Sequence, residues 1–230
     1  MLFGKTFHGR TLVNAMQKIT RFLGLSFAMC LFGAAAHAAP IITFGGQAAG
    51  DGSGLTTAVA GATVVDFNNG LMPAGYSGDG AVVSGSLAGK YAAPALNDGQ
   101  NPYLTVAYPN QVGSHTILPG GSYNYFGLYW GSMDNYNTLA FYAGGQLITS
   151  LTGADVISGA APGDQVAPGS NRYVNFFFGS AHFDRIVIST TQFAFESDNH
   201  AFARVPEPGT LALLGLGLLG AGVLRRRRAG

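Results

Sequence analysis

The sequence is poor in cysteine and in charge. Its 230 residues include a single cysteine, Cys30, and charged side chains make up only 10% of the chain. Cys30 lies in an N-terminal segment that we expect to be removed, so the mature chain holds no thiol. Disulfide bonds, a cysteine nucleophile and a cysteine-ligated metal are thereby excluded. We expect the fold to depend on its apolar core alone.

Basic side chains are scarce between residues 39 and 204. This part of the chain carries four Lys and Arg residues against ten Asp and Glu residues, a net charge of −6. Binding to phosphate backbones requires clustered Lys and Arg, so we expect no nucleic acid as a partner. Nine of the ten acids are Asp, and six of these stand beside Gly or Asn, which is typical of turns first and of calcium-binding loops second.

Catalytic and metal-binding motifs are absent from the sequence of the same stretch. It contains no His-x-x-His or His-Glu-x-x-His spacing, no Gly-x-Ser-x-Gly elbow and no Asp-x-Asp-x-Asp calcium loop. Glu196 and Asp198 have the composition of a glycosidase pair, but strand alternation places them close together on one face without a second anchor. We therefore predict no enzyme activity, no metal ligands and no cofactor, with Ca²⁺ as the one ion that the acidic loops could bind.

The N-terminal 38 residues have the pattern of a secretory signal peptide. A basic region with Lys18 and Arg21 precedes an apolar stretch, and Ala36 and Ala38 form the small-x-small site that signal peptidase requires. We expect residues 1–38 to form a signal helix that signal peptidase removes after Ala38. The mature chain is therefore exported.

The C-terminal residues 205–230 have three parts. In order, these are the motif Val205, Pro206, Glu207 and Pro208, an apolar run from Leu211 to Leu224, and the cluster Arg225, Arg226, Arg227 and Arg228. The prolines disfavour helix and keep the motif extended. The apolar run has no polar face, so we expect a short transmembrane helix in the inner membrane, with the arginines extending to the interface. The arginines resist translocation and act as a stop-transfer signal.

These three parts, in this order, resemble the PEP-CTERM sorting domain, a tail that is also labelled the C-terminal domain of ice-binding proteins. The resemblance implies that exosortase, a membrane transpeptidase with a catalytic cysteine, is a partner and recognises the motif. It also implies transient anchoring in the inner membrane before transfer to the cell surface or the extracellular matrix. Repeated Thr-x-Thr ranks, which an ice-binding face requires, are absent from the sequence.

Residues 39–204 have the length of one domain and the pattern of an all-β fold. Short β-branched or aromatic runs alternate with Gly, Pro, Asn or Asp. The predicted strands are Ile41–Phe44, Thr63–Phe67, Ala81–Ser84, Tyr103–Tyr108, Ser114–Leu118, Tyr123–Trp130, Thr138–Ala143, Gln146–Leu151, Arg172–Phe178, Phe183–Ser189, Phe193–Glu196 and His200–Ala203. We predict a two-sheet antiparallel sandwich of jelly-roll type, with residues 154–170 as its longest loop.

Two local patterns give more detailed predictions, one for the pairing of two strands and one for the residues of the core. Gly144 and Gly145 suit a two-residue hairpin turn, which would place Phe141 opposite Ile148 and Tyr142 opposite Leu147. The predicted core residues share the inward face of their strands. They are Phe126, Leu128, Trp130, Phe141, Ile148, Phe176, Phe178, Ile186 and Ile188.

The strand that begins at Tyr123 carries tyrosines on the face opposite its apolar residues. If that face is open, Tyr123, Tyr125 and Tyr129 form a row on which sugar rings can stack, with Asp134 and Asn135 at its rim. The alternative is that both faces are covered and the tyrosines pack inside the fold.

Taken together, these patterns predict an exported protein, sorted by exosortase, with a non-catalytic binding or structural ectodomain at the cell surface or in the extracellular matrix. Extracellular polysaccharide is the expected ligand of a binding module. A calcium-assisted, lectin-like carbohydrate-binding module and a matrix glycosidase are the alternatives.

Overall fold

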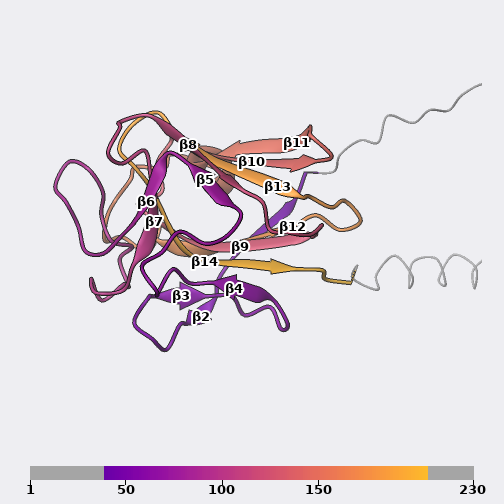
Figure 1. Cartoon of the computed structure of the whole chain (residues 1–230), viewed down its shortest axis with the longest axis horizontal. Coiled ribbons are helices and arrows are strands. Elements are labelled where there is room, and N and C mark those ends of the chain that lie inside the picture. The colour runs from indigo at the N-terminus through magenta and orange to yellow at the C-terminus, as the bar shows by residue number, and fades with distance from the viewer. Residues whose placement is uncertain (1–38, 207–230) are drawn as a thin grey trace, which may run out of the picture. The chain divides into compact units, whose positions relative to one another are not determined.

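The computed structural model describes residues 39–206, which form an all-β domain of antiparallel sheets (Figure 1). The predicted signal helix and transmembrane helix lie outside these residues. Within residues 39–206, no helix is long and apolar enough to cross a membrane.

Two sheets make up most of the domain. The larger contains, in spatial order, β1 (Ile41–Phe44), β12 (Arg172–Phe177), β9 (Tyr125–Gly131), β14 (Phe195–Ala203), β7 (Tyr103–Val106) and β6 (Gly80–Val83), and β4 (Thr63–Val65) also pairs with β14. The second contains β11 (Gln146–Thr152), β10 (Asn137–Ala143), β13 (Arg185–Thr190), β8 (Gly113–Ile117) and β5 (Tyr76–Gly78). Short strands β2 (Gln47–Ala48) and β3 (Leu55–Thr56) form a separate pair.

One apolar core joins the two large sheets, as expected of a β-sandwich. Phe126 of β9 makes an edge-on contact with Phe141 of β10 at 5.8 Å between ring centroids. Trp130 stacks on Phe195 of the neighbouring strand β14 at 4.3 Å. All the predicted core residues are buried except Ile148, which is half-buried and packs against the core. Period-two alternation therefore identified the inward faces correctly. The finer assignment to a jelly roll stays a prediction.

The opposite face of the larger sheet is also covered. Tyr125, Tyr129 and Tyr173 are 0% exposed and form a second apolar cluster with two alanines of β14. Leu55 and Val59, from the segment that contains β3, pack against this cluster. The prediction of an exposed tyrosine row is therefore wrong, because the N-terminal part of the domain folds back as a partial third layer. The packing alternative is the correct one.

The tyrosine hydroxyls find partners inside this layer. The Tyr125 hydroxyl donates to Asn175 Oδ1 at 2.8 Å, and the Tyr129 hydroxyl accepts from the Leu96 amide at 3.0 Å. Gly127 makes room for the neighbouring rings, since a Cβ there would lie 2.7 Å from the Tyr173 ring. Tyr123 precedes β9, and its half-buried ring packs near Phe202 on the side of the main core.

The Gly144–Gly145 hairpin confirms half of the predicted register. Tyr142 lies opposite Leu147 as predicted, but Phe141 lies opposite Thr149 rather than Ile148. A bulge between Phe141 and Tyr142 shifts the register by one residue. Both glycines have positive φ, 53° and 85°, as a primed turn requires.

The secondary structure also differs from the sequence-based prediction at several other places. The two strands predicted at 193–196 and 200–203 form one strand, β14, with a register shift between Asp198 and Ala201 and a positive φ of 49° at Asn199. The predicted long loop starts with a short helix, α2 (Gly153–Ile157), which Thr152 caps through a capping box with Asp155. The short strands β2, β3 and β5 were not predicted.

Both ends of the domain lie at the same end of the larger sheet (Figure 1). Ile41 pairs with Phe177, which pairs with Tyr125, which in turn pairs with Ala203. The chain therefore enters and leaves the domain at the same end of this sheet, on strands that are separated by β12 and β9. At the other end of the sheet, Gly131 pairs with Glu196, where β9 ends and β14 begins.

Candidate functional site

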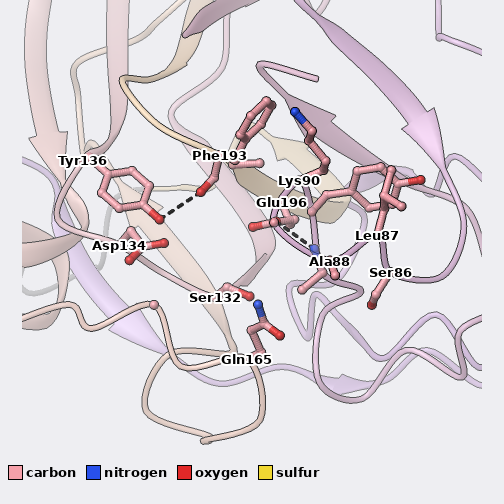
Figure 2. A pocket seen from close by; sticks show the side chains of 15 residues that line it. Ser86, Leu87, Ala88, Lys90, Ser132, Asp134, Tyr136, Gln165, Phe193 and Glu196 are labelled. Carbon is pink, nitrogen blue, oxygen red and sulfur yellow. Dashed lines mark hydrogen bonds between the residues drawn. The ribbon is translucent and has the colours of Figure 1, made fainter. Parts of the chain in front are cut away.

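A cavity of about 420 Å³ opens at the end of the larger sheet where β14 begins (Figure 2). It is lined by residues 86–92, Ser132, Asp134, Tyr136, Gly163, Gln165, Phe193, Ala194 and Glu196. These residues come from loops that are far apart in the sequence, and the two sheets bring the loops together. The cavity is therefore a product of the tertiary fold.

The loop of residues 86–92 forms one wall and is held at both of its ends. The Leu87 amide donates to the Tyr91 carbonyl at 2.9 Å, which closes a turn. The Tyr91 ring makes edge-on contacts with Tyr103 and Tyr108 at 6.4 and 5.1 Å. The Ala92 amide donates to Glu196 Oε1 at 3.0 Å, and this bond ties the loop to β14.

Glu196 is the most unusual residue of the cavity. It lies on β14 between Gly131 of β9 and Thr105 of β7, and only 2% of it is exposed. Its Oε1 accepts from Ala92, whereas its Oε2 is buried without a hydrogen-bond partner within the described residues. Burial raises the pKa of Glu196 to about 8, and the charge of Asp134 adds to this shift. The Glu196 carboxyl therefore carries a proton at neutral pH.

Asp134 supplies a second carboxyl to the cavity. Its backbone amide donates to Asn137 Oδ1 at 3.1 Å, which fixes the loop before β10. The Asp134 carboxylate lies directly against Gly163, where a Cβ has no room. Burial raises the pKa of Asp134 above its ordinary value, and the neighbouring Tyr136 hydroxyl opposes this effect. The structure thus places Asp134, predicted as a rim residue, inside the cavity.

Aromatic and basic side chains form the rest of the wall. The Lys90 ammonium lies 4.1 Å from the centroid of the Phe193 ring, and the Tyr136 hydroxyl donates to the Phe193 carbonyl at 3.0 Å (Figure 2). The Ser132 hydroxyl is buried and has no partner within the described residues. The cavity therefore combines ring faces, hydrogen-bond donors and two carboxyl groups.

The other predicted ligand residues do not line this cavity. Asn135 is exposed, and its Oδ1 accepts from the Ala161 amide at 2.8 Å, so its side chain orders the neighbouring loop. Tyr125 and Tyr129 lie in the covered cluster. Of the five predicted ligand residues, Asp134 alone belongs to the cavity.

Asp198 shares a face of β14 with Glu196, as alternation predicted, yet its surroundings differ. It is fully buried and absent from the cavity lining. Its Oδ1 accepts from the Asn199 amide at 2.7 Å, and its Oδ2 has no partner within residues 39–206. Burial raises the pKa of Asp198 to about 8. The carboxyl that accompanies Glu196 in the cavity is Asp134, which sequence alternation could not reveal.

Groups of three or more His, Cys, Asp or Glu side chains that could hold a metal ion do not occur among residues 39–206. Asp134 and Glu196 are the two carboxyl groups of the cavity lining. A lining of this composition can exchange hydrogen bonds with a polar ligand and pack ring faces against it.

The sorting segment begins on the surface of the domain. The Val205 amide donates to Asn124 Oδ1 at 2.7 Å, and Asn124 Nδ2 donates to the Val205 carbonyl at 2.8 Å. Asn124 Nδ2 also donates to the Gly179 carbonyl at 2.7 Å. Asn124 therefore fixes the point at which the chain leaves the fold. Pro206 follows and is exposed. The other predicted residues of the motif, Glu207 and Pro208, lie outside the described residues, as do the stop-transfer cluster and the signal cleavage site.

Comparison with known families identifies this tail. Residues 204–228 match the family model of the PEP-CTERM protein-sorting motif, which confirms the resemblance drawn from the prolines, the apolar run and the arginines. The motif indicates a protein that is exported and sorted by exosortase.

No curated protein matches the chain. Among solved structures, the chain is similar to the structure of the CBM32-1 and CBM32-2 domains of ZmpB from Clostridium perfringens in complex with GalNAc. The identity is 11% and the TM-score is 0.32, with 63% of this chain and 39% of that chain covered. The role of the cavity must therefore be inferred from its own residues.

Proposed function

We propose that the protein is displayed at the cell surface or in the extracellular matrix after sorting by exosortase, and that its ectodomain binds a neutral sugar unit of a polysaccharide without catalysing a reaction. The observation that carries this proposal is a pair of buried polar atoms on residues that line the cavity, Glu196 Oε2 and Ser132 Oγ, which find no partner within the described fold. Leaving such groups unpaired is unfavourable, and a ligand rich in hydroxyl groups can pair both.

The charges of the cavity favour an uncharged ligand. Lys90 brings a positive charge and Asp134 a carboxyl, while burial keeps a proton on Glu196. The cavity therefore has no excess of positive charge to attract a polyanion and no excess of negative charge to attract a strongly cationic group. Tyr91, Tyr136 and Phe193 add ring surfaces, and carbohydrate sites commonly combine such surfaces with a few polar groups.

The location of the cavity suits a displayed protein. The cavity lies at the start of β14, and the chain leaves the domain just after the end of that strand. Glu196 and Ala203 pair with Gly131 and Tyr125 of β9, which lie about 20 Å apart at the usual rise per residue. The binding site is thus directed away from the end that carries the sorting tail.

A test of the binding proposal is a neutral-glycan array followed by calorimetry with the exported protein. Gly163→Ala introduces a Cβ where the Asp134 carboxylate lies, so we expect it to displace Asp134 and weaken binding at least tenfold. Gly120→Ala is a matched control, because Gly120 also has a positive φ of 75° and nothing lies within 4 Å of a Cβ there. If both variants bind as the parent does, or the parent binds no glycan, the cavity is not a sugar site.

The sorting proposal has its own test. Glu207→Ala in the full-length protein should leave an unprocessed precursor in the membrane fraction, because the residue between the two prolines is part of the motif. Replacing Arg225 to Arg228 with Ser should mislocalise the protein, since the stop-transfer charges are lost. Pulse-chase labelling with fractionation measures both effects. Normal maturation of the Glu207→Ala protein would contradict the role of the motif.

A matrix glycosidase is the second candidate, because one observation favours it. A protonated Glu196 and a nearby second carboxyl, Asp134, are the two groups that a general acid and its partner would need. Release of reducing sugar from the glycan that the protein binds, lost in both Glu196→Gln and Asp134→Asn, would establish this activity. Binding without any hydrolysis supports the non-catalytic module.

A further inference from the structure

The carboxyl of Glu196 is held in one orientation. Its strand pairs on both sides, with Gly131 of β9 and Thr105 of β7, so the backbone cannot shift easily. The bond from the Ala92 amide fixes Oε1, which leaves Oε2 as a buried oxygen without a partner within the described residues, on a side chain that lines the cavity (Figure 2). A side chain that is 98% buried and has an unpartnered oxygen beside a cavity points to a ligand atom as the missing partner.

The titratable groups around Glu196 come from three elements. The loop of residues 86–92 contributes Lys90 and Tyr91, the loop before β10 contributes Asp134 and Tyr136, and β7 contributes Tyr103. Burial is the main cause that raises the pKa of Glu196, Tyr103 and Tyr136; the charge of Asp134 adds to the shift of Glu196, and the charge of Glu196 adds to the shifts of Tyr103 and Tyr136. Because these tyrosines stay neutral, none of them can take the proton from Glu196 near neutral pH.

We propose that Glu196 determines the specificity of the cavity as a protonated hydrogen-bond donor, whose Oε2–H bonds an acceptor oxygen of the bound sugar. This inference rests on the proposed function and assigns the recognition step to one atom. A sugar that presents a hydroxyl or ring oxygen to Oε2 is accepted, whereas a sugar that presents an apolar edge leaves the donor unpaired and is rejected.

The proposal makes binding depend on pH. The ionised form of Glu196 has no proton to donate and repels the lone pairs of an acceptor oxygen. Burial raises the pKa of Glu196 to about 8, so the fraction of binding-competent protein falls as pH rises through that value. Because apparent affinity scales with the competent fraction, we expect it to fall about tenfold between pH 7 and pH 9.

The experiment is an NMR titration of the exported protein with D-galactose, D-glucose and N-acetyl-D-glucosamine, each at pH 6, 7, 8 and 9, with D-galacturonic acid as a charged probe. The parent should bind at least one neutral sugar and lose about tenfold in affinity from pH 7 to pH 9. Glu196→Gln keeps an acceptor for Ala92 and places an amide donor at the other position without a titratable proton. We expect this variant to lose the pH dependence.

Asp198→Asn is the matched control. Asp198 is a second buried carboxyl whose pKa burial also raises to about 8, but it does not line the cavity. The Asp198→Asn protein should therefore keep the tenfold decline. A decline that persists in Glu196→Gln, or disappears in Asp198→Asn, would overturn the proposal.

A measurement on the parent protein avoids any dependence on variant folding. Selective ¹³C labelling of glutamate carboxyls should show one group that titrates near pH 8 and whose pKa rises when the bound sugar is added, because ligand binding and protonation are linked. A pKa that does not move on saturation with the sugar contradicts the proposal. If the parent binds none of the four probes at any pH, both the inference and the proposed function fail, whereas binding that is constant with pH removes the inference alone.

Discussion

The buried carboxyls of β14 should make the stability of the domain depend on pH, and Asp198→Asn tests this directly. Asp198 is fully buried and Glu196 is 2% exposed, and burial raises the pKa of each to about 8. In the unfolded chain both groups ionise near pH 4. Between about pH 5 and pH 7 the folded domain therefore holds two protons that the unfolded chain has released, and it loses them as pH rises through about 8. Its free energy of unfolding must fall as pH rises through this window.

The size of the effect follows from the number of protons. Each proton held only by the folded state lowers the free energy of unfolding by about 1.4 kcal/mol per pH unit. His200 acts in the opposite direction, because burial lowers its pKa to about 3 and its contribution to stability is lost as pH falls below its usual 6.5. Above pH 6.5 the carboxyls dominate, but with pKa values of about 8 they begin to ionise before pH 7.5, so we expect an average slope of about −2 kcal/mol per pH unit between pH 6.5 and pH 7.5. Asp198→Asn should halve that slope.

The assay is guanidinium unfolding at pH 6.5, 7.0 and 7.5, followed by the fluorescence of Trp130, the one tryptophan of the chain. Asp164→Asn serves as the control. The Asp164 carboxylate is exposed, and hydrogen bonds from the Val166 and Ala167 amides lower its pKa, so it stays ionised in this range. A parent stability that is constant from pH 6.5 to 7.5, or an Asp198→Asn slope equal to that of the parent, would refute the reasoning.

Three further predictions concern packing and the sorting segment. Trp130→Ala removes a fully buried ring and should cost about 3 to 5 kcal/mol, measured by the unfolding midpoint or by loss of soluble protein. Tyr129→Ala should cost a similar amount, about 3 to 5 kcal/mol, and a stable variant in either case would place that ring outside the core. Asn124→Ala removes the two hydrogen bonds that hold Val205, so trypsin should cut after Arg204 faster than in the parent. Asn110→Ala, at an exposed position, is the control and should leave the rate of trypsin cleavage unchanged.

The sequence predicted the strands and the main core because both depend on local pattern. Alternation placed Phe126, Leu128 and Trp130 on the inward face of β9, and the structure buries all three. The same rule could not say what lies against the other face of the strand. The covering segment has short strands and few large apolar residues, so its own sequence gives little sign of a third layer. Gly127, which leaves room for neighbouring rings, was the local signal of close packing on that face.

The cavity was harder to predict because its walls come from distant loops. Asp134 was proposed as a ligand residue for its position after an aromatic strand, and the structure places it in the cavity. Glu196 was considered only together with Asp198, since period-two spacing is the relation that a sequence shows. It is the structure that singles out Glu196, because it lies in a strand whose nine residues are all buried, and a carboxyl among buried residues calls for a specific partner.

The difference between the two carboxyls of β14 explains why one can serve recognition and the other cannot. Both are buried, both have an unpartnered oxygen within the described fold, and burial raises the pKa of each to about 8. Asp198 is covered by protein, so its unpaired oxygen remains a permanent cost to stability. Glu196 borders a cavity, so a ligand can relieve the same cost, and binding then stabilises the fold. Because this cavity lies at the opposite end of β14 from Val205, release of the tail by exosortase should leave the affinity for sugar unchanged.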